Sequence, residues 1–283
     1  MSQNLAAAYA HCDALLRDGN KDQWLCNLFA PAQKRPHLAA LYAFALEMAQ
    51  LRDKVTEPMA GEIRLQWWRD VLAGAGRGSV SANPLAAALL DTIERFHLPG
   101  QAFQDLISGR EFDLYHDPMP DMFALEIWCG GIFGATVRLA CLILANGADP
   151  GGAAAAGHAG MALGITSLLR DLARASARTR VYVPGDVLGR HGLAAADILA
   201  RSTNPAIAAA LAELRGLARV HLAQAGQGRG DSAALIAPAF LGLALVEPDL
   251  SRMDRRGYDP FKPVIDVPQW RRQWAIWRAA QKA

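Results

Sequence analysis

Cysteine, lysine and metal-binding motifs are scarce in this 283-residue chain. Its four cysteines (Cys12, Cys26, Cys129 and Cys141) show no C-x-x-C spacing and lie in apolar helical patterns. They are therefore expected to be reduced thiols in the core. The chain has no H-E-x-x-H, Walker or G-x-S-x-G motif, and its seven histidines are scattered. The sequence thus gives no support for a zinc protease, a P-loop nucleotide site or a serine hydrolase.

A large excess of one charge is also missing. Lys and Arg number 29, Asp and Glu number 27, and no run of five like charges occurs, which argues against an extended nucleic-acid surface. Only five of the basic residues are lysine. An arginine excess suits forked contacts to carboxylate or phosphate, and genomic base composition produces it as well. Apolar residues make up 52% and charged residues 20%, as in ordinary globular domains.

No targeting or membrane-spanning segment is expected. The N-terminus lacks a charged start followed by an apolar stretch, so no signal peptide is predicted. Residues 127–145 are long enough to be considered as a span, but Arg138 lies at their centre and three glycines interrupt them. That pattern favours a buried helix. Residues 232–246 are too short and contain Pro238. We therefore expect a cytoplasmic protein, with peripheral contact to the inner membrane as a further option.

Helical periodicity covers nearly the whole chain. Apolar residues recur at three- and four-residue steps in residues 38–49 and 63–71, which predicts amphipathic helices. Two Asn-Pro pairs, at 83–84 and 204–205, each place an N-cap residue before a proline at the first helical position. About ten to twelve helices are expected. The one β-branched alternation, "RVYVP", is too short for a sheet.

No repeat or low-complexity linker divides the chain. Two Gly-x-Gly stretches, "GAGRGSVSANP" and "GQGRG", do not follow strands and are interpreted as linkers rather than phosphate loops. The sequence predicts one all-α domain over residues 1–283. Its ends are expected to be an N-terminal helix within 1–20 and a Trp-rich helix within 267–283.

One stretch, "SLLRDLARASARTRVYVPGD" (residues 167–186), combines a lone aspartate with several arginines. Asp171 has Ser167 and Ala175 one helical turn away on either side, so no second carboxylate shares its helix face. This pattern suggests a site for an anionic ligand from which a partner acid is missing. An ion-pair network in an ordinary helix bundle would use the same residues, and both interpretations remain open from this stretch alone.

Two longer segments carry a family resemblance. "LYAFALEMAQLRDKVTEPMAGEIRLQWWRD" and "GMALGITSLLRDLARASARTRVYVPGDVLGRHG" together resemble the squalene/phytoene synthase superfamily, whose members condense two prenyl diphosphates head to head. The resemblance runs from about Trp24 to the C-terminus. It implies a single-domain, isoprenoid-synthase-type helical bundle around a central cavity. In that family, D-x-x-x-D motifs on two helices clamp a diphosphate through Mg²⁺ ions, which take oxygen ligands.

This chain keeps half of each acidic motif. The first motif falls on residues 49–53, with Asp53 present and Ala49 in place of the other aspartate. The second begins at Asp171, and Ala175 stands in place of its partner. The resemblance therefore implies a degenerate site with no catalytic residue expected. Asp53 and Asp171 are the residual candidates for a metal.

The remaining site residues favour an anionic ligand held by arginines. Glu57 lies four residues after Asp53, but Pro58 follows it directly and is expected to end that helix. No cofactor is expected, and Mg²⁺ enters only if the protein is an active prenyltransferase. The candidate ligand-binding residues are Arg52, Asp53, Glu57, Arg170, Asp171, Arg174, Arg180 and Tyr182.

The cavity itself is expected between two helices. The apolar faces of residues 38–53 and 158–175, together with the family resemblance, imply facing helices around this central cavity. Leu46, Met48 and Leu163, or their neighbours, are expected to line one side of it, and arginines the other.

The stretch "AFALEMAQLRDKVTEP" and the ending "VIDVPQWRRQWAIWRAA" resemble the acid-poor branch of this superfamily, which includes a mitochondrial assembly factor for respiratory complex I and bacterial relatives. This resemblance implies a non-catalytic assembly or binding factor, whose partner is a respiratory-complex subunit or an assembly protein. An active Mg²⁺-dependent prenyltransferase with an altered metal site is the first alternative. A binding protein for isoprenoid or anionic lipid is the second.

The C-terminal segment places Trp270, Trp274 and Trp277 at positions i, i+4 and i+7, which form one helical stripe. The stripe either packs on the main bundle or docks on a membrane surface or a partner. Docking on lipid is plausible chemically because Trp favours the headgroup level and basic residues attract anionic lipid. The basic residues expected to border the stripe are Arg271, Arg272 and Arg278.

Overall fold

The computed structural model describes residues 3–55, 57–76, 80–262 and 267–282. Within these residues the fold is helical and contains no strand, as the sequence predicts. Its α-helices are α1 (Gln3–Gly19), α2 (Lys21–Asn27), α3 (Arg35–Lys54), α4 (Pro58–Leu72), α5 (Pro84–Phe96), α6 (Gly100–Phe112), α7 (Met122–Cys129), α8 (Ala135–Leu144), α9 (Ala153–Ala177), α10 (Gly185–Arg190), α11 (Ala195–Leu199), α12 (Pro205–Gln227), α13 (Ala233–Phe240), α14 (Val246–Met253) and α15 (Gln269–Ala280). Short helical turns occupy η1 (Val80–Ala82), η2 (Gly130–Gly134), η3 (Gly230–Ser232) and η4 (Leu241–Leu245).

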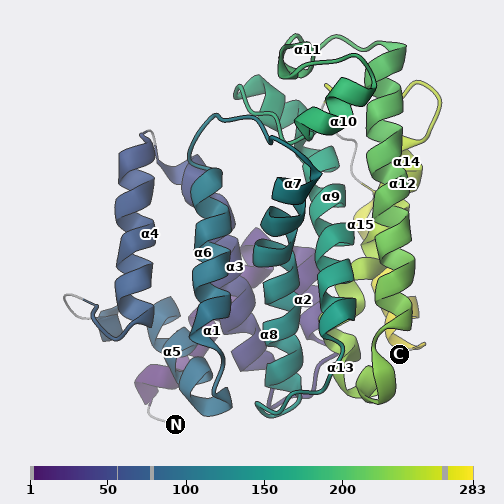
Figure 1. Ribbon diagram of the computed structural model, residues 1–283. Coiled ribbons are helices and arrows are strands. Elements are labelled where there is room, and N and C mark those ends of the chain that lie inside the picture. The colour runs from purple at the N-terminus through teal and green to yellow at the C-terminus, as the bar shows by residue number, and fades with distance from the viewer. Residues whose placement is uncertain (1–2, 56, 77–79, 263–266, 283) are drawn as a thin grey trace.

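The long helices run roughly alongside one another (Figure 1). Helix α9 passes through the middle, with α12 packed along it, while α4 and α6 lie toward the opposite edge from α12 (Figure 1). Two apolar clusters fill the bundle: one joins α1, α3, α5 and α8, and the other joins α9 and α12 to their neighbours. All four cysteines are buried and unbonded, in agreement with the sequence.

Local sequence features set several helix starts. The Asn83 side chain accepts a hydrogen bond from the Ala86 amide, and Asn204 accepts one from Ile207, which satisfies backbone donors that the first helical turn leaves free. The described residues contain more helices than the sequence suggests. Short helices such as α10 and α11 span too few residues to display a 3.6-residue period.

Two glycines allow the middle of the bundle to close. A side-chain carbon on Gly160 of α9 would lie 2.5 Å from the backbone nitrogen of Gly134, in the π-helical turn between α7 and α8. Because such an approach excludes any side chain, the glycines bring α9 against the helical run Met122–Leu144. Arg138 in that run donates to the Gly151 carbonyl and pairs with Asp149.

Two helical runs, Met122–Leu144 and Ala233–Met253, are long and apolar enough to cross a membrane by length and composition alone. The most apolar window of the first run is 61% buried inside the fold, and that of the second is 50% buried. A core helix passes the same test. The extensive burial of the first run agrees with the sequence-based expectation of a buried helix.

Helix α15 turns its tryptophans outward. The exposed fractions of Trp270, Trp274 and Trp277 are 63%, 54% and 45%, whereas Arg272 and Ile276 are buried. The stripe therefore does not pack on the bundle, which removes one of the two sequence-based interpretations. The expectation that Arg272 borders the stripe is wrong, because this side chain points inward and forms ion pairs there.

A buried polar cluster joins α1, α3 and α5. The Tyr9 hydroxyl lies 2.8 Å from His37 Nδ1, donates to Asp91 over 2.5 Å, and contacts the Thr92 hydroxyl. Burial, together with the positive charges of Arg95 and Lys34, lowers the pKa of His37 to about 4, and Asp91 opposes this only in part. The folded protein thus resists protonation of His37.

This depressed pKa predicts acid sensitivity. The unfolded chain binds a proton at His37 near pH 6.5, while the folded protein does so only near pH 4, so stability is fully present above pH 6.5 and falls as the pH drops toward 4. We expect His37 to account for about 2 kcal/mol of lost unfolding free energy between pH 8 and pH 5. Urea denaturation of the wild type and His37→Asn at both pH values measures it. Equal pH dependence in the two proteins would contradict this role.

Candidate functional site

The helices enclose a cavity of about 550 Å³, a size typical of sites for small molecules. Helices α3 and α9 supply facing walls, as the sequence predicts, and residues of α2, α6, α7, α8, α13, α14 and α15 also line the cavity. Leu46 and Leu163 lie on its apolar wall with Phe133. Met48 does not: it is buried in the cluster around α1, α3 and α5, so its assignment to the cavity wall is wrong.

Asp53 and Asp171 both line this cavity, and one arginine connects them. Arg174 donates from Nε to Asp171 over 2.6 Å and from Nη1 to Asp53 over 2.7 Å. Arg178 forms a second ion pair with Asp53. The hydrogen bond that Arg174 donates to Asp171, helped by the charges of Asp171 and Asp53, raises the pKa of Arg174 above its usual range. Both carboxylates are therefore neutralised by guanidinium groups.

The residues present do not fit a Mg²⁺ cluster. Ala49 and Ala175 line the same cavity as the two aspartates and offer no oxygen ligand. Among the described residues, no group of three or more His, Cys, Asp or Glu side chains is placed to hold a metal. Because Mg²⁺ needs several carboxylate, phosphate or water oxygens, the protein supplies too few ligands, and those it has are paired with arginine.

Arginines collect at the mouth of the cavity. A second hollow of about 420 Å³ is lined by Arg52, Arg178 and Arg180, and also by Asp53, Val55, His116 and Thr179. The Nε atoms of Arg52 and Arg180 are buried without a hydrogen-bond partner. Both residues are only partly buried and line the two hollows, so their guanidinium groups are suited to receive an anion at this mouth.

Tyr182 belongs to a chain of polar contacts behind the mouth. Its hydroxyl donates to Asp113 over 2.9 Å, and Asp113 also accepts from Trp128 and pairs with Arg110. Burial, and then the charge of Asp113, raises the pKa of Tyr182. Tyr182 therefore remains a neutral hydroxyl at physiological pH, fixed in orientation within the wall of the cavity.

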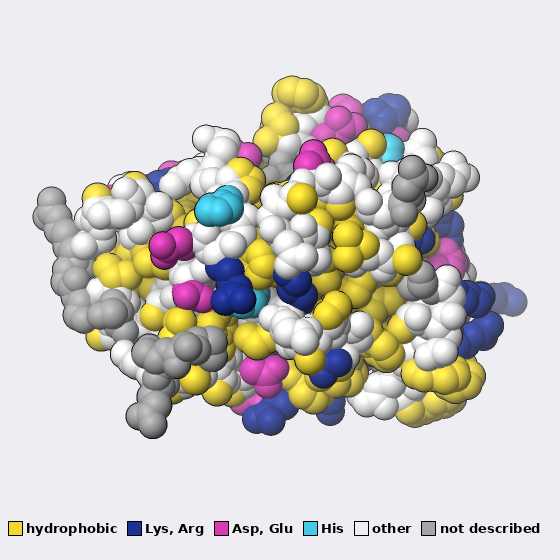
Figure 2. Space-filling model, turned by 90° about the horizontal axis from the view of Figure 1, so that it is seen from below, with side chains coloured by type: hydrophobic (Ala, Val, Ile, Leu, Met, Phe, Trp, Pro, Cys, Tyr) yellow, Lys and Arg dark blue, Asp and Glu magenta, His cyan; other side chains and the backbone are white. Residues whose placement is uncertain are grey.

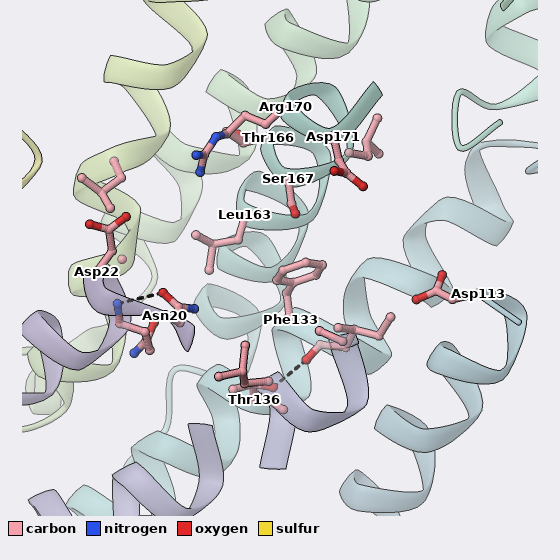
Figure 3. Close-up of a pocket in the computed structure, with 18 of the residues that line it drawn as sticks. Asn20, Asp22, Asp113, Phe133, Thr136, Leu163, Thr166, Ser167, Arg170 and Asp171 are labelled. Carbon is pink, nitrogen blue, oxygen red and sulfur yellow. Dashed lines mark hydrogen bonds between the residues drawn. The ribbon is translucent and has the colours of Figure 1, made fainter. Parts of the chain in front are cut away.

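Arg170 points to the other side of the cavity. Figure 3 shows Arg170 and Asp171 leaving α9 in different directions, Arg170 on the side of Asp22 and Asp171 on the side of Asp113. Arg170 pairs with Asp249 over 3.4 Å, and Asp249 is shared with Arg272. Arg170 is thus part of a wall of ion pairs rather than of the arginine group at the mouth.

Within the described part of the chain, ion pairs in this wall link Asp22, Arg170, Asp249 and Arg272. Arg272 of α15 contacts Asp22 of α2 at 2.5 Å and Asp249 of α14 at 3.0 Å, and the side chains of Arg272 and Asp249 are each only 6% exposed. Burial raises the pKa of Asp249, although Arg170 and Arg272 oppose this. All four residues line the cavity.

The sequence-predicted ligand residues are thus divided by the structure. Arg52, Asp53, Asp171, Arg174, Arg180 and Tyr182 line one end of the cavity or its mouth, and Arg170 lines the opposite side. Glu57 is exposed at the N-cap of α4, after the end of α3, and lines neither hollow. Residues that sequence reasoning missed are Asp22, Arg110, Asp113, Arg178, Asp249 and Arg272.

Comparison with known proteins gives a consistent result. The sequence profile of the family described as Squalene/phytoene synthase matches residues 16–278. "NADH dehydrogenase (ubiquinone) complex I, assembly factor 6" of Mus musculus is 28% identical over 92% of this chain and 78% of its own length. "Presqualene diphosphate synthase" of Rhodopseudomonas palustris is 28% identical over 75% of this chain and 76% of its own length.

Solved structures agree on the fold. Squalene synthase HpnC from Alicyclobacillus acidocaldarius is 25% identical and superposes with a TM-score of 0.74, covering 92% of this chain and 98% of its own. A dehydrosqualene synthase in complex with ligand is 19% identical and superposes with a TM-score of 0.80 over 99% of this chain and 98% of its own. Sequence and architecture together show that this chain belongs to the squalene/phytoene synthase family.

Proposed function

We propose that this protein is a non-catalytic member of its family that acts as an assembly or binding factor for respiratory complex I, peripherally at a membrane. One observation carries the loss of catalysis: Arg174 bridges Asp53 and Asp171, the two acids left of the metal motifs. A guanidinium in this position supplies the positive charge that a metal would otherwise bring. The similarity to complex I assembly factor 6, over most of both chains, supports the assembly role.

The cavity supports a ligand of definite chemistry. Its apolar wall, which includes Leu46 and Leu163, suits a hydrocarbon chain, and the arginines at its mouth suit an anionic head group. We infer that an isoprenoid or an anionic lipid occupies it. Arg52 and Arg180, which line both hollows and are only partly buried, would hold the head group through their guanidinium groups.

Deletion of the gene tests the assembly role. We expect the deletion strain to contain less assembled complex I on native gels, with other respiratory complexes unchanged, and wild-type protein to restore it. Asp53→Asn/Asp171→Asn should restore it as well, because the proposal gives these carboxylates no catalytic role. Unchanged complex I in the deletion strain would contradict the assembly role. A folded double variant that fails to restore it would contradict the non-catalytic interpretation.

A further inference from the structure

The outer face of α15 is aromatic and basic. The rings of Trp274 and Trp277 stack with centroids 4.9 Å apart, and the guanidinium of Arg271 lies 5.0 Å from the Trp270 ring centroid. Residues 267–282 contain no acidic residue. The surface therefore combines apolar rings with positive charge and carries no carboxylate of its own.

The rotation of α15 about its axis is fixed from the inside. Arg272 is anchored by Asp22 and Asp249, and Ile276 packs in a small apolar cluster with Leu241 and Leu245. At about 100° per residue, the three tryptophans point away from the side of the helix that holds Arg272 and Ile276. The tryptophans therefore stay exposed unless a partner outside this chain covers them.

The basic residues lie beside the aromatic stripe rather than behind it. Arg271, Arg278 and Lys282 are exposed. Arg271 and Arg278 fall about 80–100° around the axis from Trp270, and Lys282 follows the end of the helix. Figure 2 shows hydrophobic side chains next to Lys and Arg side chains at its right-hand edge, the side on which the C-terminus lies in Figure 1. Tryptophan prefers the headgroup level of a bilayer, and basic residues are attracted to anionic lipid.

We propose that the outer face of α15 docks the protein on the surface of an anionic lipid bilayer. This inference rests on the proposed function in one respect, the peripheral location at a membrane. It adds which surface of the protein makes the contact and which kind of lipid the surface binds. A 12-residue helix is about 18 Å long, so it lies on a bilayer and does not cross it. Because Arg272 on its inner side lines the cavity, docking brings the α15 wall of the cavity next to the lipid.

Vesicle flotation with purified full-length protein tests the proposal. We expect binding to phosphatidylcholine–phosphatidylglycerol vesicles at low ionic strength and weaker binding to pure phosphatidylcholine. Trp274→Ser/Trp277→Ser should bind on the order of tenfold more weakly, because two rings no longer leave water. Arg271→Gln/Arg278→Gln/Lys282→Gln should bind on the order of 100-fold more weakly at low salt, since each basic residue near an anionic surface contributes about fivefold.

Matched variants control for general changes in apolarity and charge. Phe123→Ser/Ile127→Ser removes two exposed apolar side chains from α7, and Arg17→Gln/Lys54→Gln/Arg255→Gln removes three exposed positive charges elsewhere. Both controls should bind like the wild type. Circular dichroism of each variant checks that it is folded.

Three outcomes would overturn the proposal. These are no vesicle binding by the wild type, binding unchanged by the α15 substitutions, and a dimer in sedimentation experiments that Trp274→Ser/Trp277→Ser dissolves without any vesicle binding. The last would make the stripe a contact between two copies of the chain. None of them bears on complex I levels in the deletion strain, so the docking surface and the assembly role stand or fall separately.

Discussion

A variant carrying Ala49→Asp, Arg174→Gln and Ala175→Asp is expected to bind Mg²⁺ in the cavity, whereas the wild type is expected to bind none there. The two new carboxylates join Asp53 and Asp171, which line the same cavity, and loss of Arg174 frees both native acids for a metal. Residues that only hydrogen-bond to metal ligands change metal affinity by about 10–100-fold. Two added direct ligands should therefore raise the Mg²⁺ affinity by at least about 100-fold. Isothermal titration calorimetry near neutral pH measures the change.

A variant of equal size without the new charges provides the control. Ala49→Asn/Arg174→Gln/Ala175→Asn changes the same positions but adds no carboxylate, and we expect only weak Mg²⁺ binding from it. Each single Ala→Asp change should also bind less well than the pair, because both acids face one metal. Wild-type protein that binds Mg²⁺ as tightly as the Ala49→Asp/Arg174→Gln/Ala175→Asp variant would show that Arg174 does not exclude the metal.

Arg272→Met is expected to destabilise the protein by about 3 kcal/mol, because it leaves Asp249 buried with a weaker set of partners. Asp249 is only 6% exposed and keeps just the longer contact to Arg170, at 3.4 Å. Asp22 loses its ion-pair partner on α15 at the same time and keeps the longer hydrogen bond from Gln269. The free energy of unfolding from urea denaturation measures the loss.

Arg271→Met is the matched control. Arg271 is the exposed neighbour of Arg272, and its substitution should change stability by no more than about 0.5 kcal/mol. Asp249→Asn combined with Arg272→Met should cost less than the sum of the two single changes, since no unpaired buried charge remains at position 249. Equal losses for Arg271→Met and Arg272→Met would mean that the network does not anchor α15.

Local features of the sequence predicted local features of the structure. The two Asn-Pro pairs begin α5 and α12, as predicted. Glu57, which precedes Pro58, has an extended backbone and lies outside α3. The pairing of Arg174 with Asp171 is also local, because residues three apart lie on the same helix face. The family resemblance, which rests partly on the half-motifs at Asp53 and Asp171, located both walls of the cavity, and the apolar faces of the two helices are visible in the sequence.

Contacts between distant segments were not predictable. Arg178 pairs with Asp53 across 125 positions and Arg272 with Asp22 across 250, and no spacing rule connects residues so far apart. The direction of Arg272 was missed for a related reason: the tryptophan stripe defines one face of α15, but only packing decides which face turns inward. Met48 likewise lies on an apolar helix face that is shared between the core and the cavity.

Turnover of a prenyl diphosphate tests the central claim most directly. Purified wild-type protein is incubated with farnesyl or geranylgeranyl diphosphate and Mg²⁺, beside an active presqualene diphosphate synthase, and products are measured by mass spectrometry. Loss of one electrostatic stabiliser costs about 10²–10³ in rate, and this site lacks two acids and has the others paired with arginine. We therefore expect the substrate to be recovered unchanged. Formation of squalene, phytoene or a presqualene-type intermediate at a rate close to that of the active enzyme would contradict the account.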